Sequence, residues 1–342
     1  MFHGKQVGKQ SLAFLNPPFI LEESSIAGKK EGEGPLGGYI DEIEEEPMCG
    51  GKTWEEGESI LQSRAIAGVL KKAKLEPKDI RYLLGGDLLG QLIATSFGME
   101  NYEIPLFGLY GACSTMGESA SLGAMLVAAE YANRVIAITS SHFGSAEKQF
   151  RFPLGYGSQR PLAATWTVTG SGAIIISKDK RKTGVNIAIT GVTTGKIVDY
   201  GVKDSMNMGA CMAPAAAELI YQHFLDFNCR PTEYDKIITG DLGLVGQEIL
   251  LDILQERGYH IRENHMDCGI EIFDPKEQDT HSGGSGCGCS AITLTGYILH
   301  KMRKEQWKKV LFVPTGALLS TVSFNEGNSV PSIAHGIVLE VV

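Results

Sequence analysis

The sequence predicts an α/β protein made of two duplicated βαβ-type halves with mostly parallel sheets. Short apolar segments alternate with segments of helical periodicity along the 342 residues, which indicates strands joined by crossover helices. Landmarks in the first half then recur in the same order, about 155 to 175 residues further along the chain. The two halves are expected over residues 1–180 and 181–342.

The elements of the first half follow from the spacing of apolar residues. The N-terminal residues mix apolar pieces with Gly, Pro and acidic residues, so we expect one strand and then an irregular loop region over 16–52. Leu61, Ala65 and Val69 recur every fourth residue, which predicts a helix face. Further strands are expected over 83–87, 104–109 and 135–139, and a helix of small residues from Ser114 to about Ala132.

The second half repeats these landmarks. LGGDL at 84–88 is echoed by ITGDL at 238–242, each after an apolar strand and before a helix. ACST at 112–115 opens a helix of small residues, and so does GCGC at 286–289. The strands over 134–141 and 170–177 correspond to strands over 309–318 and 334–341. Matched elements in one order indicate an internal duplication.

The composition excludes several classes of partner. A formal net charge of −9 gives no electrostatic attraction to nucleic acid or to anionic lipid. No stretch approaches the roughly 20 apolar residues that cross a bilayer, and residues 1–10 lack the apolar run of a signal peptide. Seven cysteines are an odd number and have no zinc spacing, so we expect reduced thiols, no metal site and a cytoplasm-like compartment.

Seven stretches carry a family resemblance. They are GDLLGQ (86–91), GACSTMGES (111–119), SSH (140–142), EKQFRFPLGYGSQRP (147–161), TVTGSGA (167–173), MAPAAAE (212–218) and GGSGCGCSA (283–291). Together they resemble the stage V sporulation protein AD family of spore-forming bacteria, and the resemblance covers nearly the whole chain. It implies a thiolase-like fold, in which the two halves form a layered αβαβα sandwich.

The resemblance also implies a function. A protein of this kind is expected to bind dipicolinic acid for its uptake into the developing spore, with Ca²⁺ as a companion of the ligand and no other cofactor. Membrane proteins of the same stage V sporulation A operon are the implied partners, so the chain is expected at the periphery of the forespore or spore inner membrane. Thiolase-like folds generally dimerise, which makes a homodimer the expected oligomeric state.

Cys113 is the first candidate functional residue. It lies where a strand gives way to a helix, and the free N–H groups and dipole of that helix favour a thiolate. The alternative is a small buried side chain that packs the start of the helix. In the resemblance, Cys113 matches the acyl-accepting nucleophile of thiolase-like enzymes, and His281 loosely matches their catalytic histidine. An acyl-thioester transferase or condensing enzyme that uses these two residues is therefore the alternative function, while a plain surface loop is the alternative for His281.

Two departures from the enzymes argue against catalysis. The enzymes have Asn or His where this chain has Asp241, and a carboxylate there repels a developing oxyanion. Their second cysteine and glycine run are replaced by VPSIAH at 330–335, which brings His335 near the same pocket. The prediction therefore leans towards a binding protein rather than an enzyme.

The candidate ligand contacts come from equivalent aspartates and from one loop. Asp87 and Asp241 end equivalent strands, where they could cap the following helices or instead face the pocket and accept hydrogen bonds or Ca²⁺. The segment 142–160 combines guanidinium groups with aromatic rings, which suits a flat dicarboxylate, and surface pairing with Glu147 is the alternative. The candidate ligand-binding residues are Asp87, Cys113, Ser114, Thr115, His142, Arg151, Tyr156, Asp241, His281 and His335.

Overall fold

The computed structural model describes residues 4–150 and 160–342. In the first half, the main strands are β3 (Phe19–Gly28), β5 (Tyr82–Gly86), β6 (Leu106–Gly108), β7 (Arg134–Ser141) and β9 (Gly170–Ser177). In the second half, they are β10 (Ile187–Thr194), β11 (Lys236–Thr239), β12 (His265–Asp267), β14 (Lys309–Val313) and β16 (Ser332–Val341). Short strands accompany them: β1 (Gly4–Val7), β2 (Ser11–Phe14), β4 (Glu42–Glu44), β8 (Trp166–Thr167), β13 (Gly284–Ser285) and β15 (Thr315–Ala317).

The main strands are arranged in the same order in both halves. Among the described residues the order is β12-β11-β14-β16-β10-β3-β9-β7-β5-β6. Read from its outer edge inward, each half therefore places its strands in equivalent positions, and the halves meet where β10 pairs with β3. The outer strands β5, β6 and β7 pair in parallel, as do β11, β12 and β14, while the strands nearer the centre pair antiparallel. The boundary near residue 180 itself stays a prediction.

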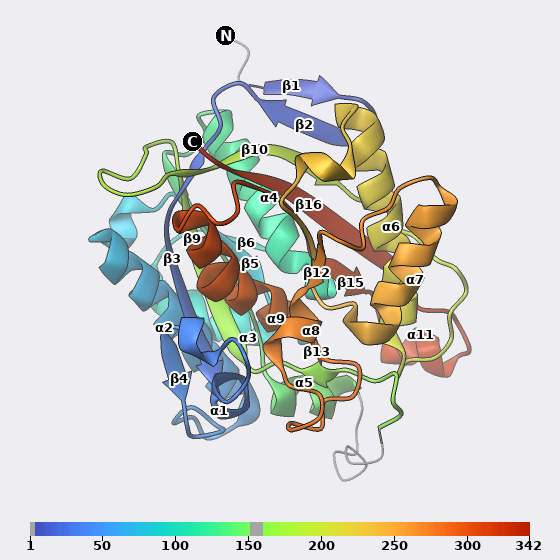
Figure 1. Cartoon of the computed structure of the whole chain (residues 1–342). Coiled ribbons are helices and arrows are strands. Elements are labelled where there is room, and N and C mark those ends of the chain that lie inside the picture. Colours follow the sequence, from blue (N-terminus) through green and yellow to red (C-terminus); the bar gives the residue numbers. More distant parts are fainter. Residues whose placement is uncertain (1–3, 151–159) are drawn as a thin grey trace.

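Helices form three layers around these strands (Figure 1). The helices α2 (Trp54–Ala73) and α3 (Ile93–Met99) cover the first half, and α6 (Met208–Phe227) and α7 (Gly243–Glu256) cover the second. The helix α4 (Thr115–Ala128) lies between the halves, because it contacts β5, β7 and β9 on one side and β10 and β16 on the other. The helix α9 (Cys287–Ile292) contacts β7, β9 and α4 in the same layer. The predicted α/β layered class is confirmed.

The remaining short helices connect these layers. They are α1 (Lys29–Gly32), α5 (Phe143–Phe150), α8 (Cys268–Ile272), α10 (Leu299–Arg303) and α11 (Thr321–Asn325).

Small residues let the central helix α4 fit between two sheets. Ala120 and Ala124 are fully buried. A Cβ on Gly117 would lie 2.5 Å from the carbonyl oxygen of His335, and one on Gly123 would lie 2.9 Å from a methyl carbon of Ile176. Because larger side chains would push the halves apart, the small-residue run fixes the position of the N-terminus of α4.

The prediction of an irregular loop region over 16–52 is wrong for its first part, which contains a strand. Residues 19–28 form β3, which pairs with β9 along most of its length. The sequence there includes Glu22 and Glu23, which suggest a solvated loop. Arg181 lies 2.7 Å from Glu22, and Arg303 lies 2.6 Å from Glu23. These ion pairs allow two acidic residues to lie within a central strand.

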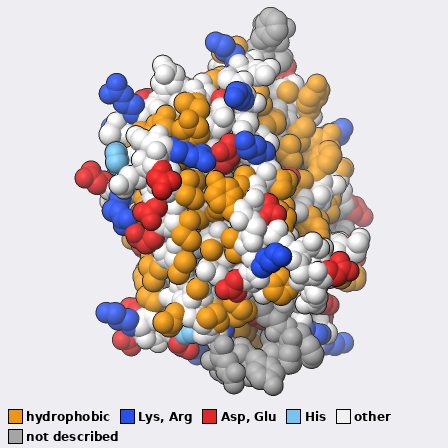
Figure 2. Space-filling model, turned by 90° about the vertical axis from the view of Figure 1, so that its right-hand side faces the viewer, with side chains coloured by type: hydrophobic (Ala, Val, Ile, Leu, Met, Phe, Trp, Pro, Cys, Tyr) orange, Lys and Arg blue, Asp and Glu red, His pale blue; other side chains and the backbone are white. Residues whose placement is uncertain are grey.

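The outer surface of the second half shows no concentration of one charge. On the face that carries α6, α7 and α11, basic and acidic side chains are interspersed among hydrophobic ones (Figure 2). Within the described ranges, no helix combines the length and apolar character needed to cross a bilayer.

Candidate functional site

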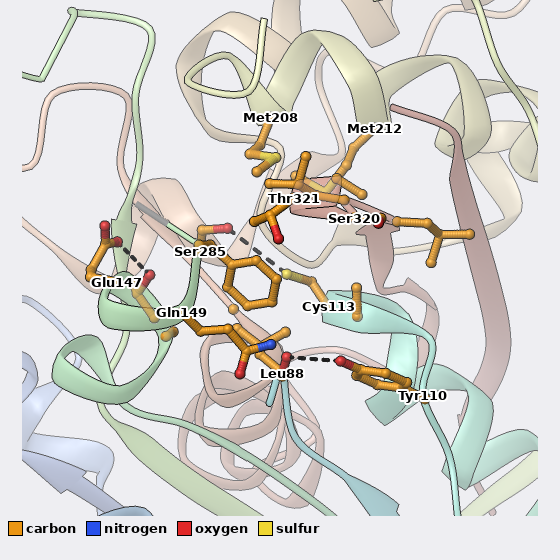
Figure 3. Close-up of a pocket in the computed structure, with 18 residues that line it drawn as sticks. Leu88, Tyr110, Cys113, Glu147, Gln149, Met208, Met212, Ser285, Ser320 and Thr321 are labelled. Atoms are coloured by element: carbon orange, nitrogen blue, oxygen red, sulfur yellow. Dashed lines mark hydrogen bonds between the residues drawn. The ribbon is translucent and has the colours of Figure 1, made fainter. Parts of the chain in front are cut away.

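A cavity of about 440 Å³ lies between the two halves, at the start of α4. Its walls come from both halves: Tyr110 and Phe150 from the first, and Met208, Met212 and Leu319 from the second. Cys113 and Ser285 lie side by side in its lining (Figure 3). Within the described residues no Lys or Arg lines this cavity, whose walls combine apolar and aromatic side chains with a few polar groups and the carboxyl of Glu147.

The turn that carries Cys113 is held by its own hydroxyl groups. Ser114 Oγ donates to the carbonyl oxygen of Gly111 at 2.7 Å, and Thr115 Oγ1 donates to that of Ala112 at 2.6 Å. Ala112 adopts a φ of 52°, a left-handed conformation that costs free energy for a residue with a Cβ. Ser114 and Thr115 therefore shape the turn and do not line the cavity in the present geometry.

A strand of the second half packs closely against the same turn. A Cβ on Gly316, in β15, would lie 2.2 Å from the carbonyl oxygen of Gly111 and 3.0 Å from the amide nitrogen of Ser114. Only glycine allows this approach, so β15 and the Cys113 turn pack backbone against backbone. The position of the thiol thus depends on residues from both halves.

Cys113, Ser285 and Asp241 form a buried polar chain at the floor of the cavity. The sulfur of Cys113 lies 3.9 Å from Ser285 Oγ, and Ser285 Oγ donates to Asp241 Oδ2 at 2.8 Å. The same Oδ2 accepts the Gly286 N–H at 2.9 Å. Asp241 is fully buried. Burial raises the pKa of Asp241 to about 7, against the lowering effect of hydrogen bonds from Cys113, Gly286 and Ser285.

The Cys113 thiol is protonated at neutral pH. Burial raises its pKa well above 9, and the negative charges that Asp241 and Cys287 can carry raise it further. The thiolate expected from the helix start is thus opposed by the surroundings of the sulfur. A neutral thiol donates a weak hydrogen bond but is a poor nucleophile.

The two equivalent aspartates have different roles. Asp87 Oδ1 accepts the Leu89 N–H at 2.7 Å, and its Oδ2 accepts both the N–H and the hydroxyl of Thr95, at 2.8 and 2.6 Å. Asp87 therefore holds the loop before α3, as in the capping alternative, and does not line the cavity. Asp241 instead bonds to Ser285, which does line it.

The three candidate histidines lie away from Cys113. His142 is buried, with Nε2 2.7 Å from the carbonyl oxygen of Pro47 and Nδ1 accepting the Gly144 N–H at 3.0 Å. Burial lowers the pKa of His142, which favours the neutral ring, and each ring nitrogen has a hydrogen-bond partner. His335 is buried within β16, and burial lowers its pKa to about 4. Neither histidine lines the cavity.

His281 is also outside the cavity. Its Nδ1 lies 3.0 Å from the carbonyl oxygen of Pro161, and its Nε2 lies 3.1 Å from a carboxylate oxygen of Asp279. It adopts a φ of 53° in the loop before β13. These contacts fit the surface-loop alternative better than a base for Cys113.

Two predicted ligand contacts, Arg151 and Tyr156, lie outside the described residues. The neighbouring Arg160 donates to the carbonyl oxygen of Asp279 at 2.6 Å and stacks 4.6 Å from the ring centre of Trp166. Within the described part of the chain, no group of three or more His, Cys, Asp or Glu side chains could hold a metal ion.

Sequence reasoning missed several cavity residues. Ser285 was part of the GGSGCGCSA stretch, but only the structure brings it to Cys113. Met208 and Met212 lie four residues apart at the start of α6, which places both on the face towards the cavity. Glu147 is buried, lines the cavity and accepts the Thr167 hydroxyl at 2.9 Å.

Comparison with known proteins gives a family and a relative. The family model described as "Stage V sporulation protein AD (SpoVAD)" matches residues 8–340. The curated protein "Stage V sporulation protein AD" of Bacillus subtilis (strain 168) is 44% identical over 336 residues, which is 98% of each chain.

Solved structures of condensing enzymes share the fold. The 3-oxoacyl-[acyl-carrier-protein] synthase III of Aquifex aeolicus is 11% identical, with a TM-score of 0.53 and coverage of 94% of this chain and 99% of that one. The priming β-ketosynthase of the R1128 polyketide pathway is 12% identical, with a TM-score of 0.57 and coverage of 99% and 98%. These likenesses confirm the thiolase-like fold predicted from the sequence and say nothing of activity.

Proposed function

The chain belongs to the stage V sporulation protein AD family, and we propose that this sporulation protein binds dipicolinic acid in the cavity beside Cys113. The observation that carries the proposal is the cavity itself. It is lined by the aromatic rings of Tyr110 and Phe150 and by methionine side chains, and it has hydroxyl, thiol and amide groups and the carboxyl of Glu147 at its floor and side. A flat pyridine ring with two carboxylates needs this combination of apolar walls and a few polar donors.

The polar donors have suitable positions. The Cys113 thiol lies at the floor, where the N-terminus of the 14-residue helix α4 favours negative charge, while the Ser285 hydroxyl beside it donates its hydrogen to Asp241. Gln149 lines the side of the cavity, and its Oε1 accepts the Gly90 N–H at 3.1 Å. Its amide has two N–H groups, and besides the hydrogen bond with Tyr110 it can donate to a ligand. One carboxylate at the floor and one at the side would each meet a donor.

Two features support binding rather than acyl transfer. The Cys113 thiol is held protonated by burial, and His281 contacts Pro161 and Asp279 instead of the cavity. An acyl-accepting cysteine needs a base within hydrogen-bond reach. The fold relationship to condensing enzymes therefore provides the shape of the pocket without a matching His base.

Ca²⁺ would enter this cavity with its ligand. The described residues offer no acidic cluster for a free metal ion, whereas dipicolinate supplies two carboxylates and a ring nitrogen of its own. The cavity would then take the neutral complex or the free dianion. Membrane proteins of the same sporulation system are the proposed recipients of the ligand, which would place the chain at the periphery of the forespore inner membrane.

We also propose a homodimer that forms through the edge of β6. This strand ends the sheet, and its outer side pairs with none of the described strands. Leu106, Phe107 and Tyr110 are 40%, 48% and 56% exposed. An exposed edge strand with apolar side chains is a ready surface for pairing with a second copy.

The test is calorimetric titration of the purified protein with dipicolinate, with and without Ca²⁺, beside intact-mass analysis after incubation with acetyl-coenzyme A. The proposal predicts saturable binding that Cys113→Ala and Ser285→Ala weaken, and no acyl adduct. No detectable binding of dipicolinate, together with an acetyl group on Cys113, would contradict the proposal and support an acyl-thioester enzyme.

A further inference from the structure

The buried carboxyl of Asp241 creates an electrostatic problem for an anionic ligand. When ionised, it places a negative charge directly behind Ser285 and Cys113, which form the cavity floor. No Lys or Arg of the described residues lines the cavity to balance that charge. Glu147 is a second carboxyl, placed in the cavity wall, where it accepts the Thr167 hydroxyl. A charge on Asp241 adds to the repulsion of a dianion at the floor, and protonation of Asp241 removes that part of the repulsion.

The two oxygens of Asp241 are not equivalent. Oδ2 accepts two hydrogen bonds, from the Ser285 hydroxyl and the Gly286 N–H. Oδ1 is buried and accepts no hydrogen bond of normal geometry from the described residues, and Cys113, which also acts on this carboxyl, offers only a weak S–H donor. An ionised carboxylate oxygen without donors is costly inside a protein, whereas a protonated oxygen carries its own donor. Oδ1 is thus the atom suited to hold a proton.

The groups that act most strongly on Asp241, all within the part of the chain that the structure describes, are thiol, hydroxyl and amide donors and one carboxyl, with no cation among them. The thiols of Cys113, Cys268, Cys287 and Cys289 all interact with it, and burial raises each of their pKa values well above 9, so they are neutral. The carboxyl of Asp267 also acts on Asp241, and its charge raises the pKa of Asp241. Asp267 itself accepts four hydrogen bonds, from the Thr239 hydroxyl and from three backbone N–H groups.

From this geometry we infer that the cavity takes up one proton when it binds a free dicarboxylate, and that Asp241 Oδ1 receives it. The proton comes from solvent, one O–H bond forms on Oδ1, and no other bond changes. The two hydrogen bonds to Oδ2 remain in place, so the floor keeps its shape in both protonation states. This inference rests on the proposed function, because it concerns the same site and the same ligand.

The sign of the pH dependence follows. An anion near Asp241 favours its protonated form, so bound ligand raises the pKa of this carboxyl above its value in the free protein. The free protein is increasingly ionised as the pH rises above 7, and each ionised molecule must bind a proton before it accepts the ligand. Affinity for calcium-free dipicolinate should fall from pH 6.5 to pH 8.5, by about tenfold per pH unit at the steepest part.

The test is titration of the whole protein with sodium dipicolinate, in the presence of a calcium chelator, at pH 8 in two buffers of different protonation enthalpy. Uptake of a proton makes the measured binding enthalpy depend on the buffer. Asp241→Asn places an amide nitrogen at the position of Oδ1 and keeps an acceptor for Ser285 and Gly286. It should bind at pH 8 at least tenfold more tightly than the wild type, with no buffer dependence.

The control is Asp252→Asn, which removes the same charge from an exposed position on α7 and should behave as the wild type. Absence of binding by the wild type in any buffer, with or without Ca²⁺, would overturn the proposed function. Binding with equal enthalpy in both buffers and constant affinity from pH 6.5 to pH 8.5 would overturn only the proton uptake. Uptake that persists in Asp241→Asn would overturn the choice of Asp241. If Asp241→Asn does not fold, the affinity of the wild type across this pH range decides alone.

Discussion

The sulfur of Cys113 lies 3.9 Å from Ser285 Oγ, and this contact joins the turns that begin the two central helices α4 and α9. Residues of the second half support both segments. Gly316 of β15 supports the Cys113 turn, and Asp241 supports Ser285. The cavity floor is therefore a joint product of both halves, and substitutions in either should affect it.

Gly316→Ala should destabilise the protein by about 2–4 kcal/mol, because its Cβ would lie 2.2 Å from the carbonyl oxygen of Gly111. Chemical unfolding followed by circular dichroism measures the change. Gly38→Ala is the matched control, since a Cβ at that position meets nothing within 4 Å. Equal stability of the two variants would contradict the close packing of β15 against the Cys113 turn.

The free energy of unfolding of the wild type should fall as the pH rises and Glu31 ionises, and Glu31→Gln should abolish this part of the pH dependence. Glu31 is buried, and burial raises its pKa from 4.5 to about 7, while its Oε1 accepts the Thr169 N–H at 2.9 Å. A raised pKa means that the folded state holds a proton which the unfolded state releases, so this contribution is complete below pH 4.5 and is lost as the pH rises to 7. The free energy at stake is up to about 3 kcal/mol.

Unfolding midpoints in urea between pH 5 and pH 8 test this expectation. The difference between Glu31→Gln and the wild type should grow in favour of the variant as the pH rises. The exposed Glu33→Gln provides the control, because it changes the same side chain two residues away without burial. A constant difference over this range would show that Glu31 does not hold a proton in the folded state.

Phe107→Lys should convert the proposed homodimer into a monomer. The substitution places a charge on the edge strand β6 at a position that is 48% exposed, where it would be buried against a second copy. Size-exclusion chromatography with light scattering reports the mass. Leu225→Lys changes an equally exposed leucine on α6 and should leave the dimer intact. A monomeric wild type, or a dimer that tolerates Phe107→Lys, speaks against this edge.

The alternation of strands and helices and the internal repeat could be predicted from the sequence itself, whereas the layered thiolase-like arrangement followed from the family resemblance, and the role of Cys113 stays a prediction. Alternating apolar segments and repeated landmarks predict the elements, and the small-residue run after Cys113 predicts a helix in a confined place. The strand β3 was missed because Glu22 and Glu23 find their cations in Arg181 and Arg303, which are far away in the sequence.

The polar floor of the cavity could not be predicted for a similar reason. Ser285 reaches Cys113 across a separation of 172 residues, and no local pattern signals that contact. Asp87 and Asp241 are equivalent in the sequence repeat, yet the N–H groups that follow Asp87 satisfy it, while Asp241 bonds to Ser285 and Gly286. Equivalent positions thus acquired different roles through tertiary neighbours.

Blocking the cavity tests the central claim most directly. Met208→Trp would fill the space between α6 and Cys113, whereas Met206→Trp adds the same ring two residues away, at a position that does not line the cavity. Calorimetric titration with dipicolinate should show saturable binding for the wild type and for Met206→Trp, and at least tenfold weaker binding for Met208→Trp. Undiminished binding by Met208→Trp, or no binding by the wild type, would contradict the assignment of this cavity as the dipicolinate site.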